Sequence, residues 1–326
     1  MRHQNILVVG GSGFVGGHLV SALAGDGRRV AVPSRRREVA KRLILLPTVD
    51  VVEADVADDA TLARLVAGRD AVINLVGILH GDRKAFDAAH VELPRRIAAA
   101  CVAARVPRLL HMSALGAAVD GPSLYLRSKG EGEAIVEAAG LASASGVALA
   151  TTIFRPSVVF GPDDRFMNLF ASMQRVLPIV PLARATAHFQ PVSVHDVVLA
   201  FVKSLDESET FGRTYELTGP RIYTLEELVQ IAGSLRAGGN GKPRRVIRLP
   251  DVLGRLQATF LEHAPGPTLM SRDNFDSMRT DNVASGRYPG FGELGIVPRA
   301  LEESAAFDLG RVNRRAHLDR LRHDAH

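Results

Sequence analysis

The residues best suited to chemistry in this sequence are a tyrosine and a lysine four positions apart, Tyr125 and Lys129. On a helix these two side chains would project from one face and could reach the same ligand. Ser113 ends an apolar stretch that is typical of a buried strand, twelve positions before Tyr125. The three residue types together predict a proton-transfer site.

A tyrosine needs help to act as a base, because the ordinary pKa of a phenol is about 10. A neighbouring ammonium and a cationic ligand both stabilise the phenolate, so we expect Lys129 and such a ligand together to bring the pKa of Tyr125 into the working range. The Ser113 hydroxyl would donate a hydrogen bond to a substrate oxygen and stabilise its developing charge. Tyrosine and lysine at this spacing are common on exposed helices, so the prediction depends on the elements that position them.

A turn with three spaced glycines near the N-terminus predicts a site for a diphosphate. The continuously apolar residues 6–9 indicate a buried strand, and a helical pattern begins after the glycines. Gly10 permits a sharp turn, Gly13 lets the backbone approach phosphates, and Gly16 lets the helix pack closely. The helix N-terminus then presents free N–H groups to an anion. We therefore expect a dinucleotide to contact Gly10, Gly11, Ser12, Gly13, Phe14, Val15 and Gly16.

The end of the next strand predicts which dinucleotide is bound. A strand over residues 28–33 runs into Ser34, Arg35 and Arg36, with no carboxylate among them. In a dinucleotide fold this strand end meets the adenosine ribose, where a carboxylate favours NAD and arginine accommodates the 2′-phosphate of NADP. We therefore expect NADP(H), with NAD(H) as the alternative. A solvated basic helix start is the other explanation of the arginines.

Two further strand ends would complete the cofactor site. After a strand over residues 49–53, Asp55 and Val56 stand where an adenine ring would lie. The near-continuous apolar character of residues 70–77 suits a central strand buried on both faces. Ligands bind at the carboxyl ends of such strands, so Val76 and Gly77 are expected beside the cofactor.

Strands and helices alternate along this first half. Helical patterns are expected over residues 58–67 and 84–104, and a fifth strand over residues 107–113. This alternation predicts an α/β fold with a right-handed, doubly wound parallel sheet of the Rossmann type. Such a sheet would bring the predicted site residues to one edge.

The motifs resemble the short-chain dehydrogenase/reductase superfamily, in its extended or atypical branch, from residue 5 to about residue 300. Segments 189–197 and 279–283 are most similar to bacterial relatives of the Rossmann-type accessory subunit of respiratory complex I. The resemblance implies that the nicotinamide pocket is lined by Arg155, Pro156, Ser157 and Val158, and that Lys129 binds the nicotinamide ribose. Many atypical members bind NADPH tightly with no known turnover.

The second half is expected to form a smaller substrate-side subdomain. We assign residues 1–160 to the NADP(H)-binding core and 161–326 to this region, with about 186–220 returning to the core. Within it we expect helices from Asp164, from Thr224 with a capping box, and over 249–261, and a proline-bounded loop over 178–182. The 249–261 helix would build a substrate lid, with contact to a partner or membrane surface as the alternative. The basic tail, about 308–326, is either a solvated helix or a contact for anionic lipid headgroups.

Composition narrows the class of protein. With 46% hydrophobic and 23% charged residues the chain is an ordinary globular protein, with no apolar run long enough for a membrane span. The first five residues leave no room for a signal peptide, so a cytoplasmic location is expected, with a position at the inner face of the membrane as the alternative. The net charge of +5 comes with few aromatic residues, which disfavours nucleic-acid binding. The single Cys101 and the His195-Asp196 pair, predicted as a helix start, argue against a metal site.

These observations predict an NADP(H)-dependent oxidoreductase of a small-molecule carbonyl or alcohol. Tyr125 would act as acid and base, Lys129 would tune it, and Ser113 would orient the substrate. One alternative is a non-catalytic, NADPH-loaded structural or assembly protein of a respiratory or quinone-related membrane complex. A nucleotide-sugar epimerase or dehydratase is a further alternative, although the sequence shows no uridine-recognition signal. A homodimer remains open.

Overall fold

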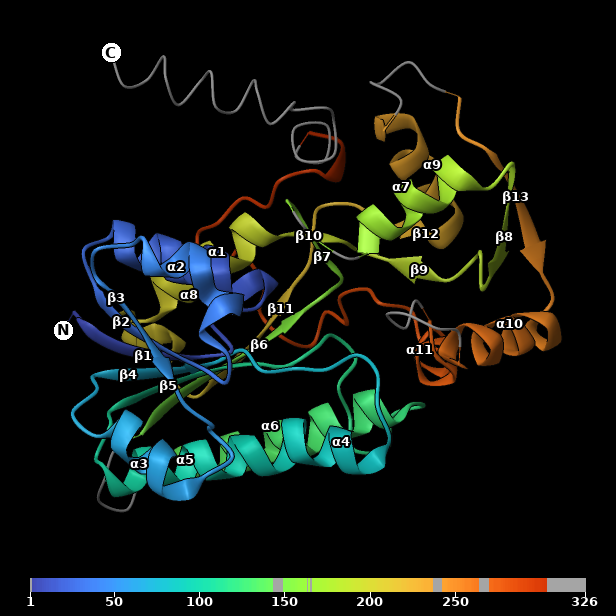
Figure 1. The fold of residues 1–326 in the computed structure, drawn as a ribbon. Helices are drawn as coiled ribbons and strands as arrows, with labels where there is room; N and C mark the ends of the chain where they lie inside the picture. The colour runs from blue at the N-terminus through green and yellow to red at the C-terminus, as the bar shows by residue number, and fades with distance from the viewer. Residues whose placement is uncertain are drawn as a thin grey trace, which may run out of the picture.

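A seven-stranded sheet with the order β11-β6-β5-β4-β1-β2-β3 lies at the centre of the chain (Figure 1). We analysed a computed structural model that describes residues 2–142, 149–162, 164, 166–236, 242–263 and 270–303. Every pairing in the sheet is parallel, which confirms the predicted fold class. Its strands are β1 (Asn5–Val9), β2 (Arg29–Ser34), β3 (Val49–Glu53), β4 (Ala71–Asn74), β5 (Arg108–Met112), β6 (Ala150–Pro156) and β11 (Arg213–Leu217).

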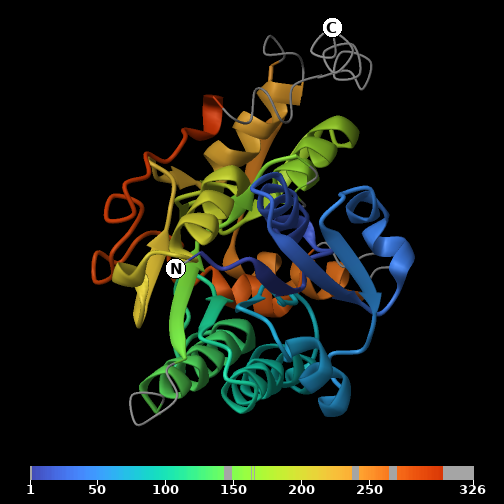
Figure 2. The same ribbon diagram turned by 90° about the vertical axis from the view of Figure 1, so that its left-hand side faces the viewer.

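Helices cover both faces of this sheet (Figures 1 and 2). On one face α1 (Phe14–Gly25) packs against α8 (Val194–Ser204), through a core that includes Leu19, Leu23 and Phe201. The other face carries a second core, and its helices are α3 (Asp59–Val66), α5 (Leu93–Ala103) and α6 (Leu124–Ala142). Cys101 is fully buried there, as a small apolar residue of α5.

The long helix predicted over residues 84–104 is confirmed, with one irregularity. It runs without a break through α4 (Arg83–Asp87), a π-helical turn η2 (Ala88–Glu92) and α5. π-helical turns inside α-helices are rare and are found frequently at functional sites. The shorter elements of this half are η1 (Arg37–Ala40) and α2 (Lys41–Ile44).

Apart from α8 and β11, which belong to the layers of the sheet, much of the second half forms a smaller unit beside the carboxyl edge of the sheet (Figure 1). Its core lies between α7 (Phe166–Val176) and α9 (Leu225–Arg236) and includes Met167, Val180 and Leu228. Short strands connect this unit to the sheet, and two helices complete it. These elements are β7 (Val159–Phe160), β9 (His188–Phe189), β10 (Val192–Ser193), β12 (Tyr223–Thr224), α10 (Asp251–His263) and α11 (Arg272–Ser277). The 3₁₀ turn η4 (Ser208–Thr210) instead packs on the sheet, where the Thr210 hydroxyl accepts a hydrogen bond from Arg108 at 3.1 Å.

The prediction of a proline-bounded loop over residues 178–182 is wrong. These residues form β8 (Ile179–Ala183), which pairs in parallel with β13 (Arg245–Leu249), a strand that the sequence did not predict. Pro181 cannot donate a backbone hydrogen bond, but β8 has only one partner strand, so one edge needs no donor.

Other predictions for this half are confirmed. The Thr224 hydroxyl accepts a hydrogen bond from the Glu227 amide at 3.2 Å, and the Glu227 carboxylate accepts one from the Thr224 amide at 2.7 Å. The helix expected over 249–261 is α10, and Asp196 lies in the first turn of α8. Of the described helices, none is long and apolar enough to cross a membrane. The basic tail lies outside the described residues.

The glycine turn makes a stability prediction that uses two adjacent positions of α1. A Cβ at Gly16 would lie 2.3 Å from the Gly10 carbonyl oxygen and 2.7 Å from Gly11 Cα, whereas at Gly17 it would meet no described atom within 4 Å. We expect Gly16→Ala to lower the free energy of unfolding by ~2–3 kcal/mol, because backbone must shift. Gly17→Ala should leave it unchanged or raise it by up to ~1 kcal/mol through helix propensity. Urea unfolding of both variants measures the difference, and equal midpoints would contradict the close packing.

Candidate active site

Four strand ends bring the predicted site residues to one edge of the sheet. Gly10 follows β1, Val76 and Gly77 lie just beyond β4, Ser113 follows β5, and Ser157 follows β6. These strands are neighbours and all run in the same direction, so their carboxyl ends form a continuous edge. The edge faces the smaller unit of the second half (Figure 1).

The glycine turn fits the diphosphate of a dinucleotide. Gly10 has a φ of +86°, in the region that favours glycine, and a Cβ there would lie 3.1 Å from the Val76 amide. Gly13 precedes α1 as its N-cap without a side-chain hydrogen bond, and a Cβ there would meet only the Gly10 carbonyl oxygen, at 3.2 Å, among the described atoms. The first N–H groups of α1 have no partner within the helix. This open, uncapped helix end is suited to an anion.

The other residues of the turn support its shape. Val15 and Gly16 are buried, Ser12 and Phe14 are half-buried, and Gly11 is buried against Val32. The Phe14 ring meets the His18 ring edge to face, with centroids 5.7 Å apart. The turn is therefore fixed by packing on both sides of the open helix end.

The arginines after β2 are available to a ligand. Arg35 and Arg36 are exposed, and within the described part of the chain no ion pair or side-chain hydrogen bond engages their guanidinium groups. Ser34 is buried, and its hydroxyl donates to the Arg36 carbonyl oxygen at 2.8 Å. At the end of β3, Asp55 is exposed and accepts a hydrogen bond from the Ala57 amide at 3.0 Å, beside the half-buried Val56.

Lys129 is the best-buried charged group of the site, with only 2% of the residue exposed. Its Nζ donates to the Met112 carbonyl oxygen at 3.1 Å and to the Val76 carbonyl oxygen at 3.4 Å. A Cβ at Gly77 would lie 3.2 Å from this Nζ, so the glycine leaves room for the ammonium. Burial lowers the pKa of Lys129 to about 8, although Glu133 acts in the opposite direction.

Tyr125 lies in the first turn of α6, one turn before Lys129. Its ring meets the His90 ring edge to face at 5.5 Å and the Phe86 ring at 6.2 Å. Burial raises the pKa of Tyr125 to about 12, and the negative charge of Asp273 acts in the same direction. By itself the chain therefore keeps this phenol protonated. A base at neutral pH would need further positive charge beside it.

Glu133 continues the helix face that carries Tyr125 and Lys129. Its carboxylate forms a bidentate ion pair with Arg155, whose Nε donates to Oε1 at 2.9 Å. Burial raises the pKa of Glu133, whereas Arg155 lowers it. The Arg155 guanidinium also lies 4.4 Å from the centre of the Tyr288 ring. Arg155 is thus engaged by two side chains, and its predicted role in the nicotinamide pocket stays a prediction.

The Ser113 hydroxyl is buried and makes no hydrogen bond to any residue that the structure describes. It lies close enough to Glu133 to help lower the pKa of that carboxyl group. Buried hydroxyl groups normally have a hydrogen-bond partner. A substrate oxygen at the strand end would supply one.

The turn after β6 is fixed by a residue from far along the chain. The Ser157 hydroxyl donates to Asn282 Oδ1 at 2.6 Å, and the Val158 amide donates to the same oxygen at 3.1 Å. The Pro156 carbonyl oxygen accepts from the Leu115 amide at 2.9 Å. The predicted pocket segment 156–158 is therefore held between the loop after β5 and the C-terminal half.

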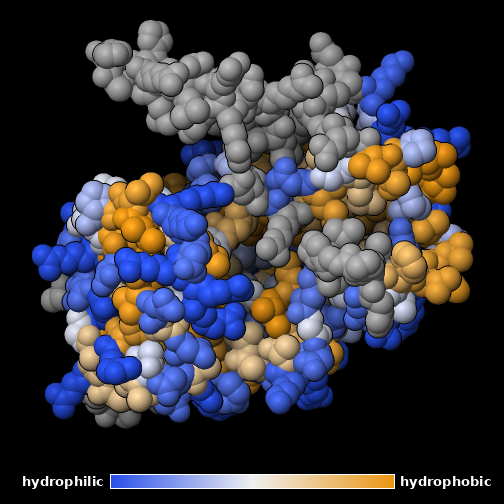
Figure 3. All heavy atoms as spheres, in the orientation of Figure 1, coloured by the Kyte–Doolittle hydropathy of each residue, from blue (hydrophilic) through white to orange (hydrophobic). Residues whose placement is uncertain are grey.

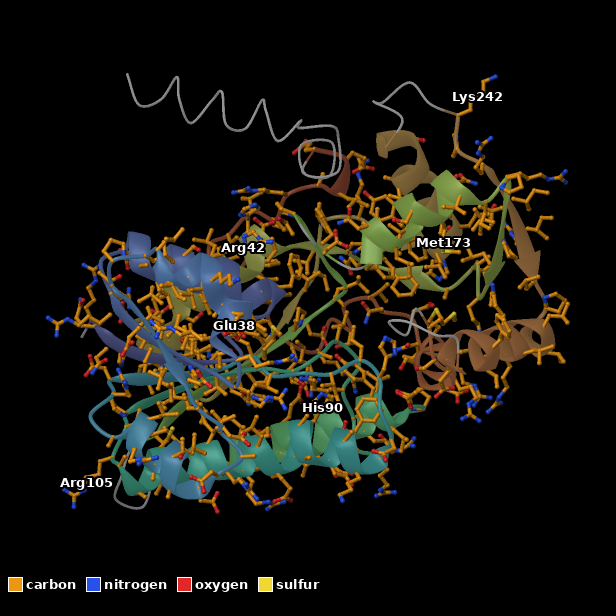
Figure 4. The ribbon with its side chains drawn as sticks, in the orientation of Figure 1. Glu38, Arg42, His90, Arg105, Met173 and Lys242 are labelled. Atoms are coloured by element: carbon orange, nitrogen blue, oxygen red, sulfur yellow. The ribbon has the colours of Figure 1, made fainter. Side chains whose placement is uncertain are left out.

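His90 is a residue of the candidate site that was not predicted from the sequence. It projects from the π-helical turn η2 and is almost completely buried (Figure 4). Its Nε2 accepts a hydrogen bond from the Ile78 amide at 3.0 Å, so in the neutral ring Nδ1 carries the proton, 2.8 Å from the Ser128 hydroxyl. Ser128 in turn donates to the Tyr125 carbonyl oxygen at 2.9 Å. Burial lowers the pKa of His90 to about 2, which keeps the ring neutral.

Asp273 of α11 caps the helix that carries Tyr125 and Lys129. Its two carboxylate oxygens accept hydrogen bonds from the Leu124 amide at 2.7 Å and from the Tyr125 amide at 3.1 Å. A negative charge at this helix end also interacts favourably with the helix dipole. The cap lies 148 residues beyond Tyr125, so no local pattern could reveal it.

The cavity of about 420 Å³ next to β11 is separate from this constellation. Its walls come from the end of β11 and from residues 284–298, and they include Glu216, Tyr288 and Phe291. Neither Tyr125 nor Lys129 lines it. Tyr288 links it to the ion pair of Arg155 and Glu133, and Glu216 is the register partner of Arg155 on the neighbouring strand.

Comparisons with known proteins show the family and the fold of this chain. The NAD dependent epimerase/dehydratase family matches residues 6–217. The chain is 31% identical over 312 residues to the mitochondrial NADH dehydrogenase [ubiquinone] 1 alpha subcomplex subunit 9 of Arabidopsis thaliana, covering 90% of this chain and 74% of that protein. It is also 31% identical over 250 residues to a ceramide reductase of Caulobacter vibrioides, covering 76% of this chain and 74% of the reductase.

Among solved structures, a double mutant of the dTDP-glucose 4,6-dehydratase DesIV from Streptomyces venezuelae, with NAD bound, is similar with a TM-score of 0.71. The match covers 96% of this chain and 98% of that one, at 20% sequence identity. At this identity the similarity shows a shared fold.

The buried ammonium predicts a pH dependence of stability. The pKa of Lys129 in the folded chain, about 8, lies below its ordinary value of 10.5. Between these values the unfolded chain binds one more proton, so the free energy of unfolding rises with pH in this window, by up to ~3 kcal/mol. Lys129→Met should lack this rise, whereas Lys84→Met, at an exposed position of α4, should keep it. Urea unfolding between pH 8 and pH 10 measures it, and parallel curves for wild type and Lys129→Met would contradict the buried charge.

Proposed function

Because the chain belongs to the NAD dependent epimerase/dehydratase family, we propose that it is an NADP(H)-dependent oxidoreductase of a small-molecule carbonyl or alcohol. A nicotinamide dinucleotide is the typical cofactor of this family. The uncapped N-terminus of α1 and the glycine turn fit its diphosphate. The preference for NADP(H) and the reaction itself are inferences from the residues around that turn.

One observation carries the proposal: the ammonium of Lys129 is bound to the carboxyl ends of the two central strands β4 and β5. Burial makes this position costly unless the charge has a use or a partner. Tyr125 precedes Lys129 by one helical turn, and the unpartnered Ser113 hydroxyl lies at the end of β5. We infer that a proton donor, a cation and a hydrogen-bond donor act together at the sheet edge where ligands bind in such folds.

In the reductive direction Tyr125 donates its phenolic proton to the substrate carbonyl oxygen, and in the oxidative direction it takes the proton back. Bound NADPH supplies the hydride. The pKa of about 12 keeps the proton on the phenol until negative charge develops on the substrate oxygen. Lys129 stabilises the phenolate that remains, and the Ser113 hydroxyl donates a hydrogen bond to the substrate oxygen. His90 and Asp273 hold the first turn of α6 in place.

Removing the phenolic hydroxyl tests this assignment. We expect Tyr125→Phe to lower kcat by about 10²- to 10⁴-fold, because a positioned acid contributes that much, while NADPH affinity stays within about twofold. Tyr223→Phe is the matched control, since the Tyr223 hydroxyl binds Glu302, at 2.8 Å, in the second half. Turnover is followed by NADPH oxidation with a panel of aldehydes, ketones and keto-lipids, the last because one relative is named a ceramide reductase. A turned-over substrate that Tyr125→Phe handles at the wild-type rate would refute the mechanism.

The exposed arginines after β2 give a separate test of cofactor choice. An arginine–phosphate pair contributes roughly 1.5–3 kcal/mol, so Arg35→Ser with Arg36→Ser should weaken NADPH binding by about 10- to 100-fold. NADH binding should change by less than about threefold, because NADH has no 2′-phosphate. Arg95→Ser, an exposed position of α5, serves as the control. Fluorescence titration of wild type and both variants with each cofactor measures the six affinities, and equal losses for both cofactors in the double variant would contradict the assignment.

A second candidate function has a specific observation behind it. Relatives that are about 30% identical over 90% of this chain are named as subunits of mitochondrial NADH dehydrogenase. On this alternative the chain is a structural or assembly protein in which NADPH stabilises the fold. NADPH would then raise the melting temperature, by mass action, without turnover of any substrate in the panel.

A further inference from the structure

We propose that the outward face of α10 docks on the surface of an anionic lipid bilayer. Four large apolar side chains of this helix are exposed: Val252 to 81%, Leu253 to 50%, Leu256 to 66% and Phe260 to 75%. Such a group on one helix exceeds the scattered apolar residues of an ordinary surface. The proposal concerns binding alone and holds whether or not the cofactor turns over.

The four side chains share one side of α10. At about 100° per residue their positions fall within a stripe roughly 100° wide. The opposite side faces the protein through small residues. Ala258 is fully buried, and a Cβ at Gly254 would lie 2.5 Å from Ala183 Cβ. A surface helix usually buries its large apolar residues, so α10 presents the reverse arrangement.

Neighbouring elements extend this apolar surface. α10 packs on β8, and β8 pairs with β13. Ile179 of β8 is 44% exposed and Ile247 of β13 is 43% exposed. Figure 3 shows hydrophobic side chains gathered over β8, β13 and the adjacent end of α10, at the right-hand edge of the molecule. The surface therefore belongs to one end of the second half.

The charges around this surface are mainly positive. Residues 242–263 contain five cations, Lys242, Arg244, Arg245, Arg248 and Arg255, and two carboxylates, Asp251 and Glu262, so their count gives a net charge of +3. Both carboxylates already pair with arginines from other elements: Asp251 with Arg184 at 3.0 Å, and Glu262 with Arg272 at 2.9 Å.

Among the five cations, Arg248 pairs with Glu226 at 2.7 Å and Arg255 lies 3.8 Å from Asp276. Arg245 is exposed on β13, and Lys242 extends outward before it (Figure 4). Within the described residues no ion pair neutralises Lys242, Arg244 or Arg245. Arg245 is the register partner of Ile179, so these cations lie beside the β8–β13 part of the apolar surface, at the end of β13 away from α10, where they can meet negative headgroups.

The positive charge of this face favours an anionic bilayer over a second copy of the chain as its binding partner. A symmetric dimer would place the same positively charged face against itself. Anionic headgroups instead complement the cations, at ~1 kcal/mol for each one near the surface. A large exposed apolar stripe with basic flanks is also the pattern of helices that lie in the membrane interface. α10 has 13 residues and is about 20 Å long. Because it is too short to cross a bilayer, it would lie along the surface.

Vesicle co-sedimentation tests the proposal. We expect the wild-type chain to bind vesicles of phosphatidylcholine mixed with phosphatidylglycerol, and to bind phosphatidylcholine alone much more weakly. Leu256→Ser with Phe260→Ser should weaken binding by about tenfold or more, because two apolar side chains no longer enter the interface. Arg245→Glu or added salt should also weaken it. The control is Val119→Ser with Leu141→Ser, exposed apolar residues elsewhere in the chain, which should bind as wild type.

Three results would overturn the proposal. One is a wild-type chain that does not sediment with the anionic vesicles, and another is a Leu256→Ser, Phe260→Ser variant that binds as wild type does. The third is a wild-type dimer that becomes a monomer in this variant, which would assign the face to a second copy. Circular dichroism and thermal unfolding of each variant show that the fold is intact, since the substituted side chains are exposed. Loss of vesicle binding with unchanged NADPH affinity separates this inference from the proposed function.

Discussion

The buried ammonium of Lys129 is the contact on which the rest of the site depends. It joins α6 to the carboxyl ends of β4 and β5, through the carbonyl oxygens of Val76 and Met112. A buried charge is costly unless its donors are satisfied, so these carbonyl groups must stay in place. Position 77 must also stay a glycine, because a side chain there would crowd the ammonium. The neighbouring Val76 backbone in turn packs against Gly10 of the glycine turn.

The second half of the chain stabilises this arrangement from outside the sheet. Asp273 caps the first turn of α6, and Asn282 fixes the turn after β6. Both residues come from the segment that follows α10, so the smaller unit supplies contacts that the sheet and its helices lack. Movement of this segment would release the Tyr125 amide and the Ser157 hydroxyl together. The same unit carries the outward apolar face of α10.

The electrostatics of the site favour a proton donor. Burial raises the pKa of Tyr125 and lowers that of Lys129, so each group resists taking its charged form. Arg155 offsets the cost of burying Glu133, whereas Asp273 adds negative charge near the phenol. A ligand with positive charge beside Tyr125 would shift this balance toward phenolate. The chain alone therefore keeps Tyr125 protonated, and loss of its proton depends on the charge of the bound ligands.

Patterns within short stretches of sequence determined the parallel sheet, the glycine turn and the shared helix face of Tyr125 and Lys129, because periodicity, glycine spacing and i, i+4 neighbours are local properties. Even the continuation of that face to Glu133 was present in the sequence. Only the tertiary structure decided that Asp273 caps α6, since that pairing joins segments 148 residues apart and leaves no local signal. It also decided that Pro181 lies in a strand, where a single partner strand makes its missing donor harmless, and that α10 turns its small residues inward. In each case the deciding contact lies on another element, which the amino-acid pattern of the segment itself does not describe.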